Sequence, residues 1–243
     1  EDNDLCRWGP NQVPAVHGFG GLTGRVYLRA VDAVRIADVY VENKPAVTEA
    51  EVFVTMENAA GRTVDGALTL TVHEWKNPGA VIWEKTVSAS VPADGKTFSF
   101  MVSAPKALIW GVRDPHLYTA SATFEASDKR IADTAEKRFG FRYFTVGEKD
   151  GDRRFYLNGK RVFIFAAMTR GFWPKTGMNP TAETARKDID IALRLGFNMV
   201  LFHRAIGQSM IIDLCDEEGL LVYEESSGYR CEPAQDEAVK TWR

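Results

Sequence analysis

Five residues with chemically useful side chains follow apolar runs of strand length in the C-terminal third of the chain. Arg170 and Trp173 come a few residues after the first run. His203 follows the second run, and Glu224 and Glu225 follow the third. In α/β folds the carboxyl ends of parallel strands share one edge of the sheet, and ligands bind there. The pattern therefore predicts a ligand site to which all three runs contribute.

Glu224 and Glu225 are the obvious candidates for catalysis, because two carboxyl groups can serve as acid and base, or as acid and nucleophile, across one bond. Adjacent residues of a strand point to opposite faces of the sheet, however. The two carboxylates therefore cannot converge on one bond, and we do not assign them as a catalytic pair. We expect one of them to be solvated or salt-bridged and the other to support a neighbouring binding residue.

The three apolar runs alternate with two amphipathic segments of helix length. The runs are 161–167, 197–202 and 220–223. Alternation of this kind is typical of βαβ units, in which parallel strands are buried by their crossover helices. The sequence therefore predicts a parallel sheet in this region.

Capping signals give the expected ends of the helices. Thr181 is a good N-cap for the first helix, and Glu183 is well placed in its first turn. The second helix is expected over Ser209–Glu218, ended by Gly219 as a C-terminal cap. A third helix is expected to begin near Ala234.

The middle of the chain, 34–146, has short runs in which every second residue is apolar, separated by turn signals about ten residues apart. Seven or so such strands predict an immunoglobulin-like sandwich, although periodicity alone leaves fibronectin-like and jelly-roll connections open. The expected strands are 35–41, 50–56, 67–73, 81–87, 97–102, 117–124 and a last run ending at Val146.

Three shorter segments complete the organisation. Residues 25–30 read as a strand, after a glycine-rich loop. The charged stretch 147–154 reads as a bridge between domains, and Asn158-Gly159 as the type I′ turn of a tight hairpin.

Composition excludes several classes of protein. The net charge of −3 gives no reason to expect a nucleic-acid partner or an anionic membrane surface. No apolar run approaches the roughly 20 residues that span a bilayer. The three cysteines form no CxxC pair, so a zinc site is not expected. The chain begins with Glu1, which indicates either a removed leader or a start within a longer protein. We favour the second, and the compartment stays open, a periplasmic or secreted location included.

Several motifs, in order, resemble glycoside hydrolase family 2, the family of β-galactosidases, β-glucuronidases and β-mannosidases. The resemblance extends over about residues 18–226. Each motif alone is modest, and their order and spacing make the resemblance specific. They are GGLTGRVYL at 20–28, WGVRDPHLY at 110–118, FGFR at 139–142, FYLNGK at 155–160, GFNMV at 196–200 and LCDEEGLLV at 214–222.

The resemblance implies a fold class: an all-β immunoglobulin-like sandwich followed by a partial (β/α)8 TIM-barrel segment. Residues 1–33 would be the C-terminal remnant of a sugar-binding jelly roll. Residues 34–146 would form the sandwich, and 147–243 about three strands of the barrel. The chain would then be a fragment, and its open barrel edge a candidate surface for self-association.

The resemblance also implies a reaction and a site. The reaction is retaining hydrolysis of a β-glycosidic bond without an organic cofactor, with both catalytic Glu residues beyond the end of this chain. The substrate would be a glycoside or oligosaccharide. His203 resembles a family histidine that lines the sugar site, and Glu225 is the carboxylate we expect there. Arg170 and Trp173 suit hydroxyl binding and ring stacking. A structural histidine and a rim aromatic packed on its loop are the alternatives.

Two departures from the family pattern motivate a competing hypothesis. Leu201 stands where the family usually has Arg, and HRA at 203–205 replaces a typical SHYP. A non-catalytic carbohydrate-binding or scaffold homologue is therefore the alternative to the enzyme. A third and weaker reading is an independent two-domain adhesion protein.

Overall fold

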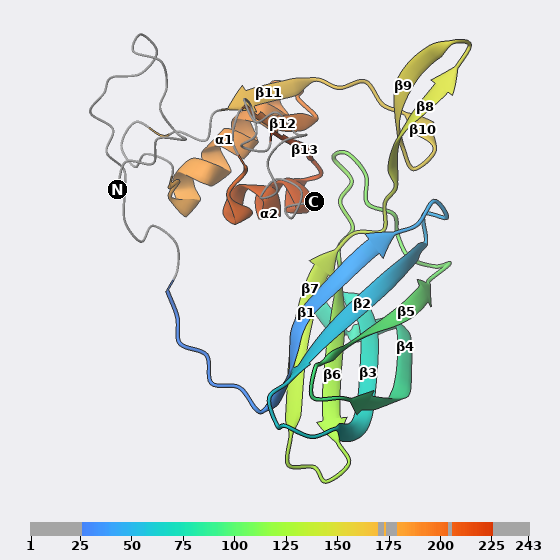
Figure 1. Cartoon of the computed structure of the whole chain (residues 1–243). Helices are drawn as coiled ribbons and strands as arrows, with labels where there is room; N and C mark the ends of the chain where they lie inside the picture. The colour runs from blue at the N-terminus through green and yellow to red at the C-terminus, as the bar shows by residue number, and fades with distance from the viewer. Residues whose placement is uncertain (1–25, 170–172, 174–178, 204–205, 226–243) are drawn as a thin grey trace, which may run out of the picture.

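The computed structural model describes residues 26–169, 173, 179–203 and 206–225. A seven-stranded antiparallel sandwich is followed by a hairpin and then by a small parallel sheet with two helices (Figure 1). The strands of the sandwich are β1 (Val34–Asn43), β2 (Glu49–Asn58), β3 (Val64–Glu74), β4 (Asn77–Val91), β5 (Lys96–Ser103), β6 (Tyr118–Ala126) and β7 (Ala132–Phe139).

The sandwich has one sheet in the order β1-β2-β5 and a second in the order β4-β3-β6-β7. Period-two alternation turns one face of each strand inward, as in β2, where Val52, Val54 and Met56 are buried. Phe100 and Phe124 fill the space between the sheets. The chain leaves the first sheet after β2 and returns to it with β5, and the two-sheet antiparallel sandwich predicted from the sequence is confirmed.

The strand expected over 25–30 is wrong for the described part of that segment. Residues 26–30 form no strand, and Val26, Tyr27 and Leu28 are 76%, 79% and 101% exposed. A strand needs a partner for its backbone groups, and no strand of the described chain pairs with this segment. Alternation of apolar residues alone is therefore not enough to predict a strand in this segment.

The charged stretch 147–154, predicted as a bridge between domains, is part of a regular antiparallel sheet. It lies in a hairpin of β8 (Phe144–Lys149), β9 (Asp152–Leu157) and β10 (Lys160–Arg161). Asp150 and Gly151 turn between β8 and β9 with φ of 57° and 75°. Asn158 and Gly159 turn between β9 and β10 with φ of 53° and 76°, as their sequence predicts for a type I′ turn.

The C-terminal region contains two consecutive βαβ units. Its strands pair in parallel in the order β11-β12-β13, as predicted. The elements are β11 (Ala166–Thr169), α1 (Ala182–Arg194), β12 (Met199–Phe202), α2 (Ser209–Glu218) and β13 (Leu221–Glu224). Thr181 caps α1 by accepting from the amide of Thr184, and Gly219 ends α2 with φ of 73°. The helix expected near Ala234 lies outside the described residues.

The first parallel strand is shorter than the predicted 161–167. Arg161 belongs to the hairpin, and residues 162–165 lead into β11 without strand pairing. The Asn198 side chain holds this lead-in. Its amide nitrogen donates to the oxygen of Phe163, and its oxygen accepts from the amide of Phe165.

Helix α2 is attached to the sandwich by arginine side chains. Arg138, at the end of β7, forms 2.7 Å ion pairs with Asp213 and Glu217, and Arg142 forms a 2.8 Å ion pair with Asp216. Arg142 therefore serves as an ion-pair partner at the junction between the sandwich and α2. Four aromatic residues near this junction are buried: Trp110, Tyr118, Phe139 and Phe141.

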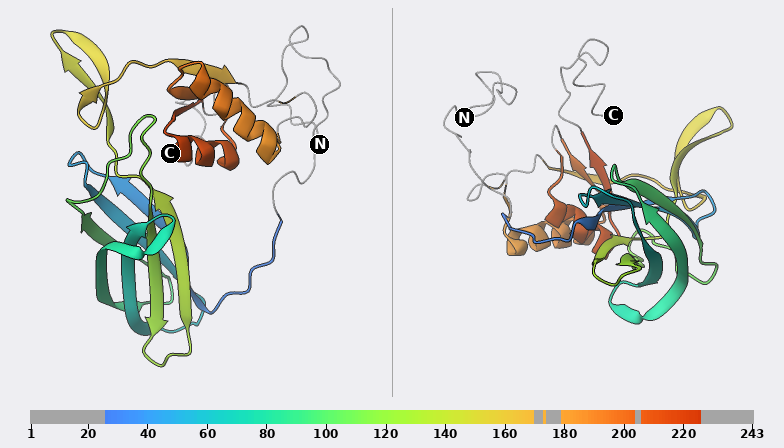
Figure 2. Two further views of the ribbon diagram at one scale, coloured as in Figure 1. Left: turned by 180° about the vertical axis from the view of Figure 1, so that it is seen from behind. Right: turned by 60° about the horizontal axis from the view of Figure 1, so that its bottom comes forward.

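The two helices lie on the same face of the parallel sheet, and Figure 2 shows this from two further directions. No helix in the described parts of the chain is long and apolar enough to cross a membrane. Among these same residues, no group of three or more His, Cys, Asp and Glu is placed to hold a metal ion.

Candidate functional site

The parallel sheet has one face covered by helices and one face turned away from them. Val200 and Phe202 pack with Ile189 of α1 and Cys215 of α2. Because alternate residues point to opposite faces, Leu201 faces away from the helices. In the register of the sheet, Leu201 lies between Met168 and Tyr223, so these three side chains form one layer of that face. The next layer, toward the carboxyl ends of the strands, contains His203 and Glu225.

His203 and Glu225 are in direct contact. Nδ1 of His203 lies 3.2 Å from Oε2 of Glu225, and the two side chains are 24% and 31% exposed. The amide of His203 donates to the oxygen of Thr169, and the amide of Glu225 donates to the oxygen of Phe202. These bonds extend the pairing of all three strands by one residue. His203 and Glu225 therefore lie together at the carboxyl edge of the parallel sheet, where the sequence predicts them.

This arrangement suits recognition of a polar ligand. The carboxylate of Glu225 fixes the orientation of the imidazole through Nδ1, as a carboxylate partner commonly does for histidine. Both contacts of the His203 ring with Glu225 are made through Nδ1, so Nε2 is the nitrogen that we expect to meet a ligand. A half-buried imidazole with one nitrogen committed can donate to, or accept from, a hydroxyl group.

Glu224 points to the other face, as strand alternation predicts. Its Oε1 accepts a 2.6 Å hydrogen bond from the amide of Gly207, in the loop that leads from β12 into α2. Glu224 and Glu225 therefore do not face one substrate bond together.

Trp173 lies on the helix side of the sheet. It is only 9% exposed, it belongs to the cluster that contains Ile189 and Phe202, and its indole nitrogen donates a 2.9 Å hydrogen bond to Asp188. This packing favours a structural role over the sugar contact predicted for Trp173. Arg170, the other residue predicted after the first strand, lies outside the described residues.

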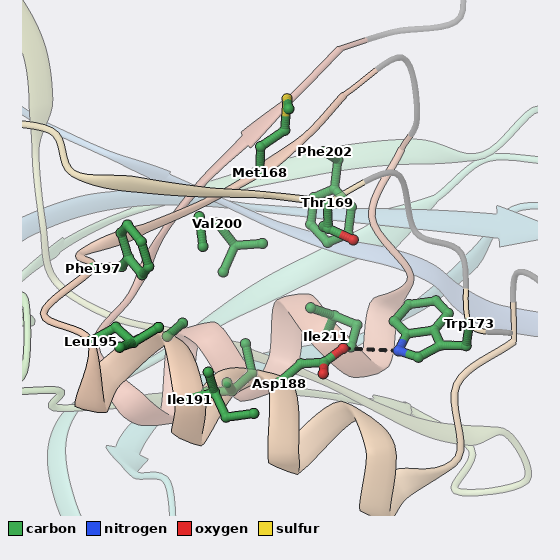
Figure 3. A pocket seen from close by; sticks show the side chains of 13 residues that line it. Met168, Thr169, Trp173, Asp188, Ile191, Leu195, Phe197, Val200, Phe202 and Ile211 are labelled. Carbon is green, nitrogen blue, oxygen red and sulfur yellow. Dashed lines mark hydrogen bonds between the residues drawn. The ribbon is translucent and has the colours of Figure 1, made fainter. Parts of the chain in front are cut away.

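A cavity of about 310 Å³ opens beside Trp173, between α1 and β11 (Figure 3). Its walls are mainly apolar, from Ile189, Phe197 and Phe202, and Asp188 at its rim is bonded to Trp173. Neither His203 nor Glu225 lines it. This cavity lies on the side of the sheet that the helices cover, away from the polar pair, and we do not take it as the ligand site.

One buried thiol is excluded from the chemistry of the site. Burial in α2, and to a smaller extent the charge of Asp216, raises the pKa of Cys215 to about 12. The thiolate is the reactive form of cysteine, so this residue is inert near neutral pH.

Sequence reasoning missed one contributor to this region and the partner of another. Thr169 provides the backbone oxygen that holds His203, and Glu224 has a defined partner in Gly207 rather than being a solvated carboxylate. The register of the predicted parallel strands could have indicated Thr169, because it falls opposite Phe202. No local signal in the sequence marks the partner of Glu224.

Comparisons with known proteins agree with this architecture. The model of "Glycosyl hydrolases family 2" matches residues 34–142. A β-galactosidase of Thermoanaerobacter pseudethanolicus is 30% identical over 214 residues, which are 87% of this chain and 28% of that protein. A putative β-glucuronidase of Formosa agariphila is 26% identical over 220 residues, 89% of this chain and 25% of that protein. The chain thus spans about a quarter of the length of these relatives.

Solved structures share the fold at lower sequence identity. A Bacteroides uniformis β-glucuronidase superimposes with a TM-score of 0.70 at 20% identity, over 81% of this chain and 24% of that one. A β-galacturonidase from Eisenbergiella tayi, solved with galacturonate, superimposes with a TM-score of 0.70 at 20% identity, over 81% of this chain and 34% of that one.

Proposed function

Because the chain belongs to glycosyl hydrolase family 2, we propose that its protein hydrolyses β-glycosidic bonds and that His203 and Glu225 line the sugar site. The chain would supply the sandwich and the first strands of a (β/α)8 barrel. The observation that carries the proposal is the contact between His203 and Glu225 at the carboxyl edge of a parallel sheet. Substrates bind at that edge in barrels of this type.

The two catalytic carboxyl groups would come from parts of the protein outside this sequence. A retaining glycosidase needs them about 5–5.5 Å apart across the scissile bond. Glu224 and Glu225 occupy opposite faces of β13 and have partners of their own, Gly207 and His203. The role we propose for His203 and Glu225 is therefore to orient a hydroxyl group of the sugar. We propose that the hydrolysis needs no organic cofactor.

The uncovered face of the parallel sheet supports a larger barrel. Met168 and Tyr223, on the face away from the helices, are 65% and 51% exposed. Apolar residues at such positions fill the interior of a closed barrel. We propose that further β/α units cover this face, and that the chain by itself would associate through it. We also propose that residues 1–33 are the end of a preceding jelly roll and that Arg170 binds the sugar.

The experiment compares the 243-residue chain with a longer protein that contains it, on a panel of nitrophenyl β-glycosides. We expect the longer protein to release nitrophenol from at least one glycoside and the 243-residue chain to release none. Hydrolysis by the 243-residue chain would overturn the assignment of the catalytic groups. Failure of the longer protein on every glycoside would overturn the proposed hydrolysis.

One observation favours a second candidate, a carbohydrate-binding homologue without hydrolysis. Leu201 lies directly below His203 on the same face, in register with Met168 and Tyr223, where the family usually has Arg. A catalytic site there would lack that arginine. Binding of a β-glycoside by the longer protein without turnover would favour this candidate.

A further inference from the structure

The loop between β12 and α2 is held by carboxylates from two adjacent residues of the neighbouring strand. On one face of β13, Glu225 contacts the imidazole of His203, where the loop begins. On the other face, Glu224 accepts the hydrogen bond from the amide of Gly207, near the end of the loop. The loop is therefore attached to β13 at both ends.

Gly207 is also packed against the residue that precedes His203. A Cβ atom at Gly207 would lie between 2.5 and 2.9 Å from three atoms of the Phe202 ring, so the loop backbone passes directly over that ring. Phe202 is 1% exposed, which leaves its ring little room to move. A displacement of Gly207 would therefore be transmitted to Phe202 and to the adjoining His203.

The start of α2 explains why a carboxylate is suitable at this point. The N-cap residue Gln208 makes no side-chain capping bond, and the first turn of α2 contains no acidic residue. Backbone amides at a helix N-terminus lack partners within the helix and carry partial positive charge. Glu224 provides an acceptor and a negative charge there from outside the helix.

We infer that Glu224 is a positioning residue, which keeps the His203 imidazole against Glu225 by holding Gly207 over the Phe202 ring. The inference rests on the proposed function only insofar as His203 contacts a sugar. The hydrogen bond and its effect on the imidazole can be measured without any sugar. Without the acceptor on Glu224, Gly207 lifts from the Phe202 ring and His203 loses its fixed orientation.

The test uses the ¹⁵N,¹³C-labelled 243-residue chain and two readouts, hydrogen exchange at the Gly207 amide and the Cε1–H cross-peak of His203. In Glu224→Ala we expect exchange at Gly207 to accelerate about fivefold to tenfold and the His203 cross-peak to shift. Glu224→Gln keeps an oxygen acceptor. In this variant the exchange rate at Gly207 should therefore lie within about twofold of that of the unsubstituted chain, and the His203 cross-peak should lie at its original position. Asp190→Ala, which removes an exposed acid from α1, is the control and should change neither.

A purely structural role would accelerate exchange at Gly207 and leave the His203 cross-peak in place, and that result would overturn the inference. Unchanged exchange in Glu224→Ala would overturn it as well. If Glu224→Ala does not fold, Gly207→Ala carries the test, because its Cβ displaces the loop from Phe202 while Glu224 is intact. A shifted His203 cross-peak in that variant supports the inference, and an unshifted one contradicts it. A protein that passes this test and hydrolyses no glycoside would refute the proposed function alone.

Discussion

The indole nitrogen of Trp110, in the connection between β5 and β6, donates a 2.8 Å hydrogen bond to the backbone oxygen of Asp216 in α2. The side chain of Asp216 accepts a hydrogen bond from Arg142, whose guanidinium lies 4.4 Å from the centre of the Trp110 ring. These three residues form a closed set of contacts between the sandwich and the helix that follows the His203 loop. The position of α2, and with it the loop that leads from His203, depends on this junction.

Replacement of Trp110 by Phe should destabilise the protein by about 1–3 kcal/mol, because it leaves a helix carbonyl without its partner. Phe also removes three ring atoms from a fully buried site, so a small cavity adds to the cost of the lost hydrogen bond. Urea unfolding measures the effect. Trp83→Phe is the control, because Trp83 packs on the sandwich core. In the described part of the chain, Trp83 forms no hydrogen bond to α2. A cost for Trp110→Phe no larger than that of the control would contradict the role of this bond.

Gly219 and Gly196 offer a matched pair of substitutions. Both have positive φ, 73° and 87°, so Ala is strained at either position by about 1–2 kcal/mol. A Cβ at Gly219 would lie 2.5 Å from the amide nitrogen of Arg113, whereas a Cβ at Gly196 meets nothing within 4 Å. We therefore expect Gly219→Ala to cost about 1–3 kcal/mol more than Gly196→Ala in urea unfolding. Equal costs would show that α2 is not held tightly against the sandwich.

Cys215 gives a prediction for alkaline pH. Its pKa is about 12 in the fold, above the ordinary thiol value of 9.0, so the folded state binds more protons than the unfolded state between these pH values. The stabilisation is complete below pH 9 and is lost as pH rises toward 12. The free energy of unfolding should thus fall more steeply with pH in the natural chain than in Cys215→Ala, by up to about 1.4 kcal/mol per pH unit. Parallel curves for the two proteins would exclude the raised pKa.

Local signals in the sequence were enough for most of the secondary structure. The bounds of α2 follow from the apolar pattern and Gly219, and the cap of α1 from Thr181. Asn158-Gly159 was recognised as a turn, while Asp150-Gly151, an equally strong turn signal, was overlooked because charged residues surround it.

Contacts between distant segments were beyond sequence reasoning. The ion pairs of Arg138 with Asp213 and Glu217 span more than 70 residues, and no periodicity links the partners. Trp173 was expected to face a sugar because aromatic residues near strand ends often do so. Its burial depends on the cluster beneath α1 and α2, which only the three-dimensional packing reveals. His203 and Glu225, by contrast, met as expected because parallel strands align their carboxyl ends.

The most direct test of the central claim measures kcat/KM of the longer protein on the β-glycoside that it hydrolyses. The test variant is His203→Ala, and Asp190→Ala is the control. A hydrogen bond from the imidazole to the sugar is worth about 1.5–3 kcal/mol if charge-assisted, so its loss should lower kcat/KM roughly tenfold to a hundredfold. Glu225→Gln should lower it less, since the amide still contacts the ring. A value for His203→Ala within twofold of the control would contradict the claim that His203 lines the sugar site.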